Sequence, residues 1–286
     1  MALEFPVPSE GDVVVVAPAP GSGPGFWSGA PSAALDTDGT LVVAYRVRVP
    51  DQRGSNIVIA RTADGQHLTT VASLTKERFD AESLERPALV RTDDGWRLYV
   101  SCATPGSKHW RIDALDATEP AAFGTSEPYT VFAGDKQVGV KDPVIRRRNG
   151  KWLAWICCHP LDPAGEEDRM TTAYATSDDG INWLWRGVVL SGRAGMWDAR
   201  GARVTAVLPD GRASYDGRAT KEENFSERTG IARLTGQGGL LVAMNDAPVS
   251  NARYLDVVPL PGGGYQLLFE MPRADGSHDL CTERIP

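Results

Sequence analysis

Carboxylic acids recur at corresponding places in the sequence, where short apolar runs begin or end. Glu85, Asp142, Asp198 and Asp256 stand at the starts of such runs, and Asp216 and Glu270 stand near the ends of the runs that follow. A protonated and an ionised carboxyl group on either side of a bond can act as general acid and general base. We therefore predict a catalytic role for Asp142, Asp198 and Asp216, and substrate binding for Glu85, Asp256 and Glu270. Any one acid of this set can instead be a simple turn or bulge residue.

A charged segment around residues 215–230 supplies two further candidates. It begins with Tyr215-Asp216-Gly217-Arg218 at the end of an apolar run and continues through Glu223 and Glu227. The corresponding segments elsewhere in the chain are plain connections, and loops on a rigid scaffold commonly carry functional residues. We predict that Glu223 and Glu227 take part in catalysis; a solvated charged loop would show the same composition.

Arginines recur at the same end of the apolar runs as the acids. The set consists of Arg46, Arg48, Arg86, Arg200, Arg218 and Arg253. A guanidinium group presents a planar fork of N–H donors that suits carboxylates and phosphates. Two interpretations are open: these arginines pair with the neighbouring acids in a structural network, or they bind an anionic ligand. On the second interpretation we predict substrate binding by Arg46, Arg86, Arg200 and Arg218.

The elements that must position these residues follow from a repeat. Pro31, Pro87 and Pro143 are spaced 56 residues apart, and each opens an apolar run. Each run leads to a glycine-containing turn and then to a second run rich in aromatic and β-branched residues, which is a strong hairpin signal. The turns are Asp38-Gly39, Asp94-Gly95, Asn149-Gly150, Asp210-Gly211 and Gly262–Gly264. Two more strand-like runs follow each of the first four hairpins, so that each of these units holds four strands.

Five units of four strands predict an all-β fold, a five-bladed β-propeller with four-stranded antiparallel blades. The fifth unit ends one strand short, after Leu280–Arg284, and the run Asp12–Ala17 is a spare strand of the right kind. We predict that this N-terminal run completes the last blade and closes the ring, which removes exposed strand edges. No linker interrupts the repeats, so residues 1–286 form one domain.

Composition and charge exclude several classes of protein. The net charge of −7 argues against binding to nucleic acid or to an anionic membrane, since both need a basic surface. No apolar stretch approaches the roughly 18 residues that span a bilayer, and Met1–Ala17 lacks the pattern of a secretory signal. The cysteines form no CxxC pair and the histidines show no metal-ligand spacing. We expect a cytoplasmic protein with reduced thiols and with no metal ion or cofactor.

Three short motifs resemble a known superfamily. Glu85-Arg86-Pro87, Lys141-Asp142-Pro143 and the segment Tyr174–Trp183 are similar to those of the five-bladed propeller glycosidases: arabinanases, β-xylosidases, invertases and mannoside phosphorylases. The resemblance implies a pocket at one end of a central channel, where three acids from different blades meet. Asp142 matches the third-blade Asp that tunes the acid and binds the sugar. Ala30 stands where a first-blade acid is expected, and Asp198 lies near the place of the expected late glutamate.

The resemblance implies a carbohydrate-active enzyme, a glycoside hydrolase that uses carboxylate acid–base catalysis in the central channel. Its substrate would be a small carbohydrate or an anionic sugar, such as a sugar phosphate or a uronate. Trp27, Trp197 and His109 stand where they could contact that sugar at the channel mouth. The arginines favour an alternative, a glycoside phosphorylase in which phosphate replaces water. Ala30 favours another alternative, a propeller that binds a sugar or anion without hydrolysing it.

Overall fold

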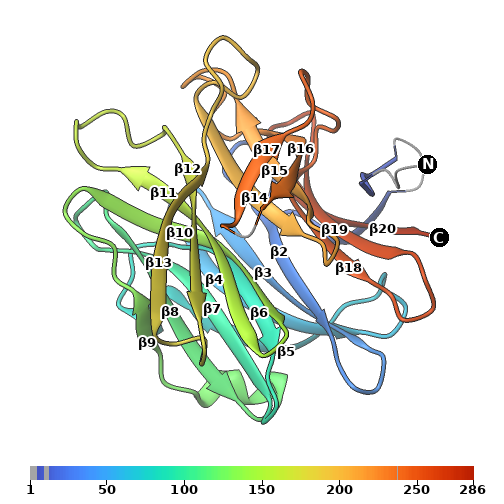
Figure 1. Cartoon of the computed structure of the whole chain (residues 1–286). Coiled ribbons are helices and arrows are strands. Elements are labelled where there is room, and N and C mark those ends of the chain that lie inside the picture. The colour runs from blue at the N-terminus through green and yellow to red at the C-terminus, as the bar shows by residue number, and fades with distance from the viewer. Residues whose placement is uncertain (1–4, 10–12, 237) are drawn as a thin grey trace.

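Four-stranded antiparallel sheets make up most of the chain in the computed structural model, which describes residues 5–9, 13–236 and 238–286 (Figure 1). Three sheets are separate, and each runs in chain order from its first strand to its fourth. They consist of β6 (Leu84–Arg91), β7 (Trp96–Ala103), β8 (Trp110–Ala117) and β9 (Tyr129–Phe132); β10 (Val138–Arg148), β11 (Lys151–Pro160), β12 (Thr171–Ser177) and β13 (Trp183–Leu190); and β14 (Gly201–Val207), β15 (Arg212–Arg218), β16 (Arg228–Thr235) and β17 (Leu240–Ala243). The prediction of an all-β fold built from four-stranded units is confirmed.

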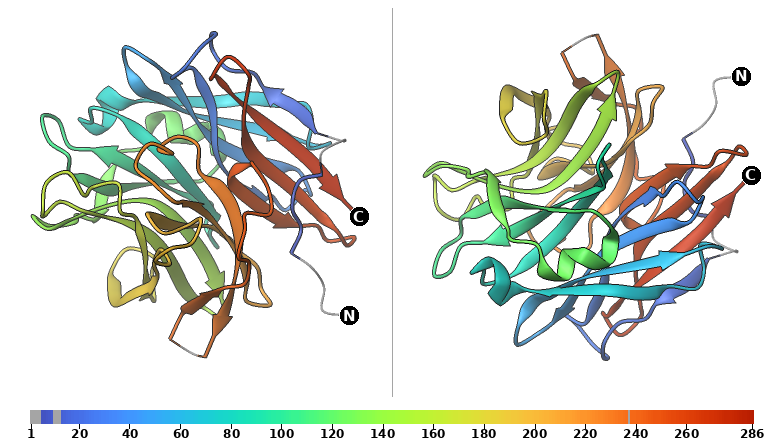
Figure 2. Two further views of the ribbon diagram at one scale, coloured as in Figure 1. Left: turned by 90° about the horizontal axis from the view of Figure 1, so that it is seen from above. Right: turned by 90° about the horizontal axis from the view of Figure 1, so that it is seen from below.

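The remaining strands form one eight-stranded sheet with two antiparallel halves. One half is β2 (Trp27–Leu35), β3 (Leu41–Val49), β4 (Arg53–Thr62) and β5 (Thr69–Thr75); the other is β18 (Arg253–Pro259), β19 (Tyr265–Pro272), β20 (His278–Ile285) and β1 (Val14–Ala17). The halves meet at a single parallel pair between Trp27 and His278. Figure 2 shows the first and last parts of the chain, in blue and red, side by side. The N-terminal run therefore pairs with the last strand, as predicted, although Asp12 lies outside the described residues.

The predicted turns join the first and second strands of their units. At Asn149-Gly150 both residues have positive φ, 51° and 74°, as a type I′ hairpin turn requires. Helical structure among the described residues is limited to two short 3-10 segments, η1 (Lys76–Phe79) and η2 (Pro120–Thr125). Within the same ranges, no helix has the length and apolar character needed to cross a bilayer.

The first strand of every unit carries an irregularity in its pairing with the second. The shifts lie between Gly29 and Ser32, Glu85 and Pro87, Lys141 and Val144, Val204 and Ala206, and Arg253 and Asp256. At three of these bulges a residue other than glycine takes a left-handed conformation: φ is 51° at Ala30, 49° at Asp142 and 51° at Tyr254. Such a conformation costs about 1–2 kcal/mol. A bulge re-aims the side chain it carries, so the first strands present selected side chains differently from regular strands.

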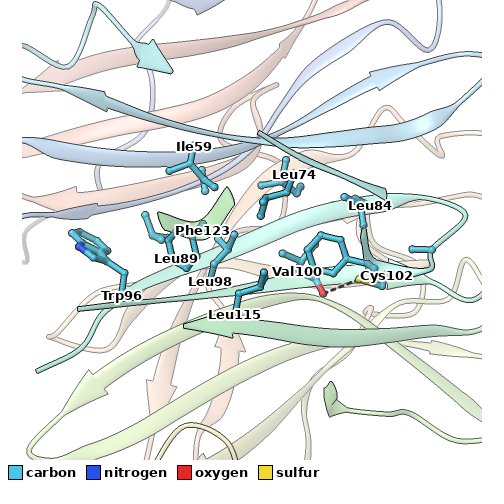
Figure 3. Close-up of a cluster of buried hydrophobic side chains, with 14 of the residues drawn as sticks. Ile59, Leu74, Leu84, Leu89, Trp96, Leu98, Val100, Cys102, Leu115 and Phe123 are labelled. Carbon is cyan, nitrogen blue, oxygen red and sulfur yellow. Dashed lines mark hydrogen bonds between the residues drawn. The ribbon is translucent and has the colours of Figure 1, made fainter. Parts of the chain in front are cut away.

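Hydrophobic side chains fill the spaces between neighbouring sheets. The cluster in Figure 3 joins Ile59 and Leu74 of one sheet to Leu98 and Leu115 of the next, with Phe123 of η2 packed against them. All five side chains are buried. Complete burial of one such side chain stabilises the fold by about 1.5–3 kcal/mol. The sheets are thus held against one another by apolar contacts, which leaves the inner strands free to carry charged residues.

Candidate functional site

A cavity of about 410 Å³ lies at one end of the inner strands. Each four-stranded unit contributes to its lining: Arg46 from β3, Glu85 from β6, Lys141 from β10, Arg203 from β14 and Tyr254 from β18. Segments 167–170 and 221–227, which lie between strands, complete the wall. Side chains distant in the sequence therefore meet in one cavity that is open to solvent on one side.

The cavity is strongly cationic, although the whole protein carries a net charge of −7. Nine lysines and arginines line it, and they are Arg46, Arg48, Arg53, Lys108, Lys141, Arg203, Arg218, Lys221 and Arg253. Four carboxyl groups line it, those of Glu85, Glu167, Asp168 and Glu227. Positive side chains thus exceed negative ones at the surface that a ligand would touch, which is an arrangement suited to an anionic group.

Arg203 joins two buried acids beneath this cavity. Its Nη1 donates to Asp142 Oδ2 at 2.9 Å and to the Tyr254 hydroxyl at 2.8 Å, while Nη2 donates to Asp216 Oδ2 at 2.6 Å. Asp142 and Asp216 are completely buried, but Arg203 and Tyr254 line the cavity. The two acids therefore lie directly behind the cavity wall and contact its lining through Arg203 and Tyr254.

Asp142 is held ionised in this position. Burial opposes the charge of its carboxylate, but Lys141, Arg203 and the other nearby cations prevail and lower the pKa of Asp142 to about 2. Its Oδ1 atom is buried and accepts no hydrogen bond from the described residues. Asp216 differs, because burial outweighs Arg203 and raises the pKa of its carboxyl group. Arg203 thus separates two carboxyl groups whose pKa values are shifted in opposite directions.

A second network of ion pairs links Arg46 and Arg253 with three glutamates. Arg253 donates to Glu227 Oε2 at 2.7 Å and also pairs with Glu270. Glu270 in turn accepts from Arg46 at 2.6 Å, and Arg46 pairs with Glu85. Each carboxylate here accepts bonds from arginine, as buried charges require. The network fixes the positions of Glu85 and Glu227 at the cavity surface.

All four carboxyl groups that line the cavity have lowered pKa values. Burial opposes the charges of Glu85 and Glu227, but arginines overcome it, and the pKa of Glu227 falls to about 2. Burial likewise opposes the charge of Asp168, and a hydrogen bond from Arg200 lowers its pKa. Backbone N–H groups lower the pKa of Glu167. At neutral pH the cavity therefore presents carboxylates, and none of these four is a ready proton donor in the free protein.

His159 lines the cavity as a neutral side chain. Its Nδ1 lies 2.5 Å from the carbonyl oxygen of Glu167, which makes Nδ1 the protonated nitrogen. Burial, reinforced by the charge of Lys141, lowers the pKa of His159 to about 3. Cys157 Sγ lies 3.4 Å from His159 Nε2, but burial raises the pKa of this thiol far above its usual value. The pair is therefore no nucleophile–base couple, because no thiolate forms at neutral pH.

The structure places the residues predicted from the sequence in three groups. Trp27, Arg46, Glu85, Arg218 and Glu227 line the cavity. Asp142, Asp216 and Glu270 lie behind it and contact its lining arginines. The others, Asp198, Glu223, Arg86, His109, Trp197, Arg200 and Asp256, do not line it.

The third group has contacts of its own. Asp198 accepts from the Tyr215 hydroxyl at 2.8 Å, and the Trp197 ring stacks on the Tyr215 ring. Arg200 pairs with Asp168 and so supports the cavity wall from behind. His109 Nδ1 lies 2.8 Å from the hydroxyl oxygen of Thr104.

The remaining members of that group are Glu223, which bonds within its own loop, and Arg86 and Asp256, which bond to the backbone of other units. Glu223 accepts from the backbone N–H of Ala219, within its own loop. Arg86 donates to the backbone oxygens of Pro31 and Thr205, and Asp256 accepts from the backbone N–H of Ala33. These bonds join the inner strands of different units.

Ala30 occupies the place that corresponds to Asp142 in another unit. Both residues lie in the first-strand bulge, both have φ near 50°, and both are completely buried. The backbone geometry is thus present in β2, and the carboxyl group that the resemblance leads one to expect there is absent.

Sequence reasoning missed Arg203 and Tyr254. Arg203 is the only charged residue within the otherwise uncharged strand Gly201–Val207, and that contrast was a usable signal. Tyr254 directly follows Arg253, but its left-handed conformation is visible only in three dimensions. Both side chains touch Asp142, so the prediction found the buried acid without the residues that connect it to the cavity.

No protein-family model matches the chain, and no curated protein matches it in sequence. Solved structures match over nearly its whole length. A thermostable family-43 glycoside hydrolase superposes with a TM-score of 0.72 at 11% identity, covering 95% of this chain and 92% of that one. The β-1,2-mannobiose phosphorylase from Listeria innocua gives a TM-score of 0.63 at 16% identity over 98% and 92% of the two chains. The α-L-arabinofuranosidase from Lactobacillus brevis gives 0.65 at 14% identity over 90% of each.

The chain therefore has the fold of these carbohydrate-active enzymes. At such low identity the similarity concerns the fold, and one fold can carry many functions.

Proposed function

We propose that residues 1–286 form a single five-bladed β-propeller closed by its N-terminal strand. The five four-stranded units would be the blades, and their bulged first strands would surround the channel. Two pairings support this arrangement: Trp27 with His278 between the halves of the large sheet, and Val14 with Thr282 between β1 and β20. Four free, buried cysteines are consistent with the cytoplasmic location expected from the sequence.

We further propose that the protein is a carbohydrate-active enzyme that cleaves a glycosidic bond in the cationic cavity. The observation that carries this proposal is the ionised Asp142, buried in a left-handed bulge directly behind a cavity with Glu85 and Glu227 on its surface. Cleavage passes through a transition state with positive charge on the sugar ring, and fixed carboxylates stabilise such charge. The solved structures of similar fold are named as glycoside hydrolases and a phosphorylase, which supports the same chemistry.

Four kinds of role can be assigned to residues in and behind the cavity. Glu227, with its low pKa, remains ionised and is the candidate base or nucleophile. Glu85 is the candidate general acid, because a bound substrate that offsets the charge of its cationic neighbours would favour protonation of this carboxyl group. Asp142 orients Arg203 and Tyr254 and adds negative charge from behind the wall. Among the aromatic residues that line the cavity, Phe225 is exposed and offers its ring to the apolar face of a sugar, whereas Trp27 and Trp110 are buried.

A phosphorylase is a second candidate, and the excess of lining cations favours it. Inorganic phosphate would then replace water as the attacking group, and the cavity would bind it beside the sugar. The empty acid position at Ala30 fits this alternative, since a phosphorylase needs no carboxylate to activate water. The lack of an acid at Ala30 also fits a protein that binds a sugar without cleaving it.

Product analysis by chromatography tests the proposal. The protein is incubated with aryl glycosides and oligosaccharides, with and without inorganic phosphate, beside a Glu227→Gln variant. Free sugar from the wild type alone establishes hydrolysis, and sugar phosphate formed only with phosphate establishes phosphorolysis. A folded wild-type protein that yields neither product from any member of the panel overturns the assignment as an enzyme of this class.

A further inference from the structure

We infer that the substrate of this cavity is an acidic sugar, and that Arg48 and Lys141 bind its carboxylate or phosphate ester group. The sugar part of this inference rests on the function proposed above. The acidic group follows from which of the buried or half-buried cations the protein itself leaves without a close partner. Lys108 and Lys221 also line the cavity without an ion pair among the described residues, but they are exposed.

Most of the buried arginines of the cavity are already occupied. Arg203 donates to two carboxylates and Arg253 to two others, and Arg218 Nη1 donates to Glu227 Oε1 at 2.6 Å. Their charges are balanced inside the protein. They position the carboxylates and have little capacity left for a ligand.

Arg48 and Lys141 are different. Arg48 Nη1 lies 3.7 Å from Glu85 Oε1, and Lys141 Nζ lies 3.6 Å from Asp142 Oδ2. Both distances exceed hydrogen-bond length, so neither cation makes a charge-assisted bond to its nearest acid. The buried Nε of Arg48 has no acceptor among the described residues, and Arg46, Arg203 and Arg218 share this feature. What distinguishes Arg48 is the distance of its Nη1 atom from Glu85. A ligand oxyanion would supply the acceptors that both cations lack.

Aromatic rings hold these two cations in place. The Arg48 guanidinium lies 4.7 Å from the ring centre of Trp27, and Lys141 Nζ lies 4.8 Å from the ring centre of Trp110. Both cations also act electrostatically on Glu85, so they flank the same carboxylate. Cations fixed in advance lose little conformational freedom when a ligand binds.

The surroundings favour an anion carried on the sugar over a free anion. Trp27, Trp110 and Phe225 all line the cavity, and the Trp27 and Phe225 ring centres lie 5.0 Å apart. Trp27 and Trp110 are buried, but Phe225 is exposed and its ring centre lies 5.8 Å from the Arg48 guanidinium. An anionic group on Arg48 and Lys141 therefore brings the attached sugar ring against Phe225. Free phosphate would satisfy the cations and leave the aromatic surface unused.

The repulsion from nearby acids does not cancel this preference. Adding the three buried carboxyl groups behind the wall, Asp142, Asp216 and Glu270, to the four that line it gives seven acids against nine cations. The local charge stays positive, in contrast to the net charge of −7 on the whole chain. An anionic ligand is attracted to this cavity even though the protein as a whole repels it.

Calorimetric titration of the whole protein tests the inference without requiring turnover. The probes are glucuronate, glucose 6-phosphate, glucose and inorganic phosphate at low and at physiological salt. The variants are Arg48→Gln and Lys141→Gln, with Arg186→Gln and Lys151→Gln as matched controls on exposed positions. We expect at least one acidic sugar to bind about tenfold or more tightly than glucose, and each cavity variant to weaken it about tenfold, as expected for one lost charge-assisted bond. Both controls should bind like the wild type.

The outcomes separate this inference from the proposed function. Glucose binding as tightly as both acidic sugars, or inorganic phosphate binding as tightly as glucose 6-phosphate, overturns the acidic-sugar assignment. Wild-type affinity for the acidic sugar in both cavity variants overturns the assignment of Arg48 and Lys141. Selective binding of an acidic sugar without cleavage of any glycoside supports the inference and counts against the enzyme. Circular dichroism of each variant confirms that a loss of binding is not a loss of fold.

Discussion

Replacement of Asp142 by asparagine should destabilise the protein by about 2–4 kcal/mol at pH 7. The surrounding cations outweigh burial, which by itself would raise the pKa of Asp142, and they lower this pKa from 3.8 to about 2. One pKa unit corresponds to about 1.4 kcal/mol. That shift alone gives a loss of about 2–3 kcal/mol. Asparagine keeps the shape of the side chain but leaves Lys141 and part of the Arg203 charge uncompensated, which accounts for the upper end of the range.

The pH dependence of this loss gives a second, independent check. Because the folded-state pKa is below the unfolded-state value, the stabilisation by ionised Asp142 is complete above about pH 5 and disappears as the pH falls through 2. Urea unfolding of wild type and Asp142→Asn at several pH values measures it. The difference in unfolding free energy should be largest at neutral pH and should shrink in acid.

Asp178→Asn is the matched control. Asp178 lies in an exposed turn, where it pairs with Lys151, and exposed pairs contribute about 0–1 kcal/mol. Equal unfolding midpoints for wild type and Asp142→Asn at pH 7 would refute the account of Asp142 as a stabilised buried charge. A difference that stays constant from pH 7 to pH 2.5 would refute its electrostatic origin.

Three other predictions concern packing, acid sensitivity and thiol reactivity. Gly54→Ala should cost about 1–3 kcal/mol or more, because the new Cβ would lie 1.7 Å from the backbone oxygen of Leu84; urea unfolding measures it. Burial lowers the pKa of His159 to about 3 in the folded protein, so its imidazole stays neutral there. In the unfolded chain the same side chain binds a proton below about pH 6.5, and thermal stability should therefore begin to fall below that pH. It should fall further towards pH 2 as Glu227 protonates, which a melting-temperature series would show. All four cysteines are buried, so a thiol reagent at pH 8 should react only after unfolding.

Each of these predictions has a contrary outcome. Gly124→Ala is the control for the first, since its Cβ would meet nothing within 4 Å, and equal destabilisation by both substitutions would contradict the clash. A melting temperature that is flat from pH 7 to pH 4 would contradict a neutral, buried His159. Rapid labelling of any cysteine in the folded protein would show that its thiol is accessible.

The strand pattern was predictable because it depends on local signals. Turn dipeptides such as Asn149-Gly150 favour positive φ wherever they occur, and alternating apolar runs on either side fix the hairpins. The run ending at Ala17 could be assigned to the last sheet because the fifth repeat was one strand short. Because the pattern repeats, the strands predicted in one unit supported the strands predicted in the others.

The site was only partly predictable, because its members are brought together by long-range packing. Asp142 and Asp198 look alike in sequence, each at the start of an apolar run, yet Asp142 pairs with cavity-lining Arg203 and Asp198 with Tyr215 and Arg193. Which acids are paired, and which cations are left without a close partner, depends on distances between units. The sequence identifies Arg48 as one of the recurring arginines, but the distance between its Nη1 atom and Glu85 Oε1 depends on the fold.

The pairing of β1 with β20 has a consequence for how the chain is made. Val14 belongs to β1, which is synthesised before the other described strands. Its partner Thr282 belongs to β20, which is synthesised after them. During synthesis β1 therefore stays without its partner until β20 has left the ribosome. The contact between β1 and β20 can form only after Thr282 has been synthesised, so a chain halted before β20 would leave β1 without its partner.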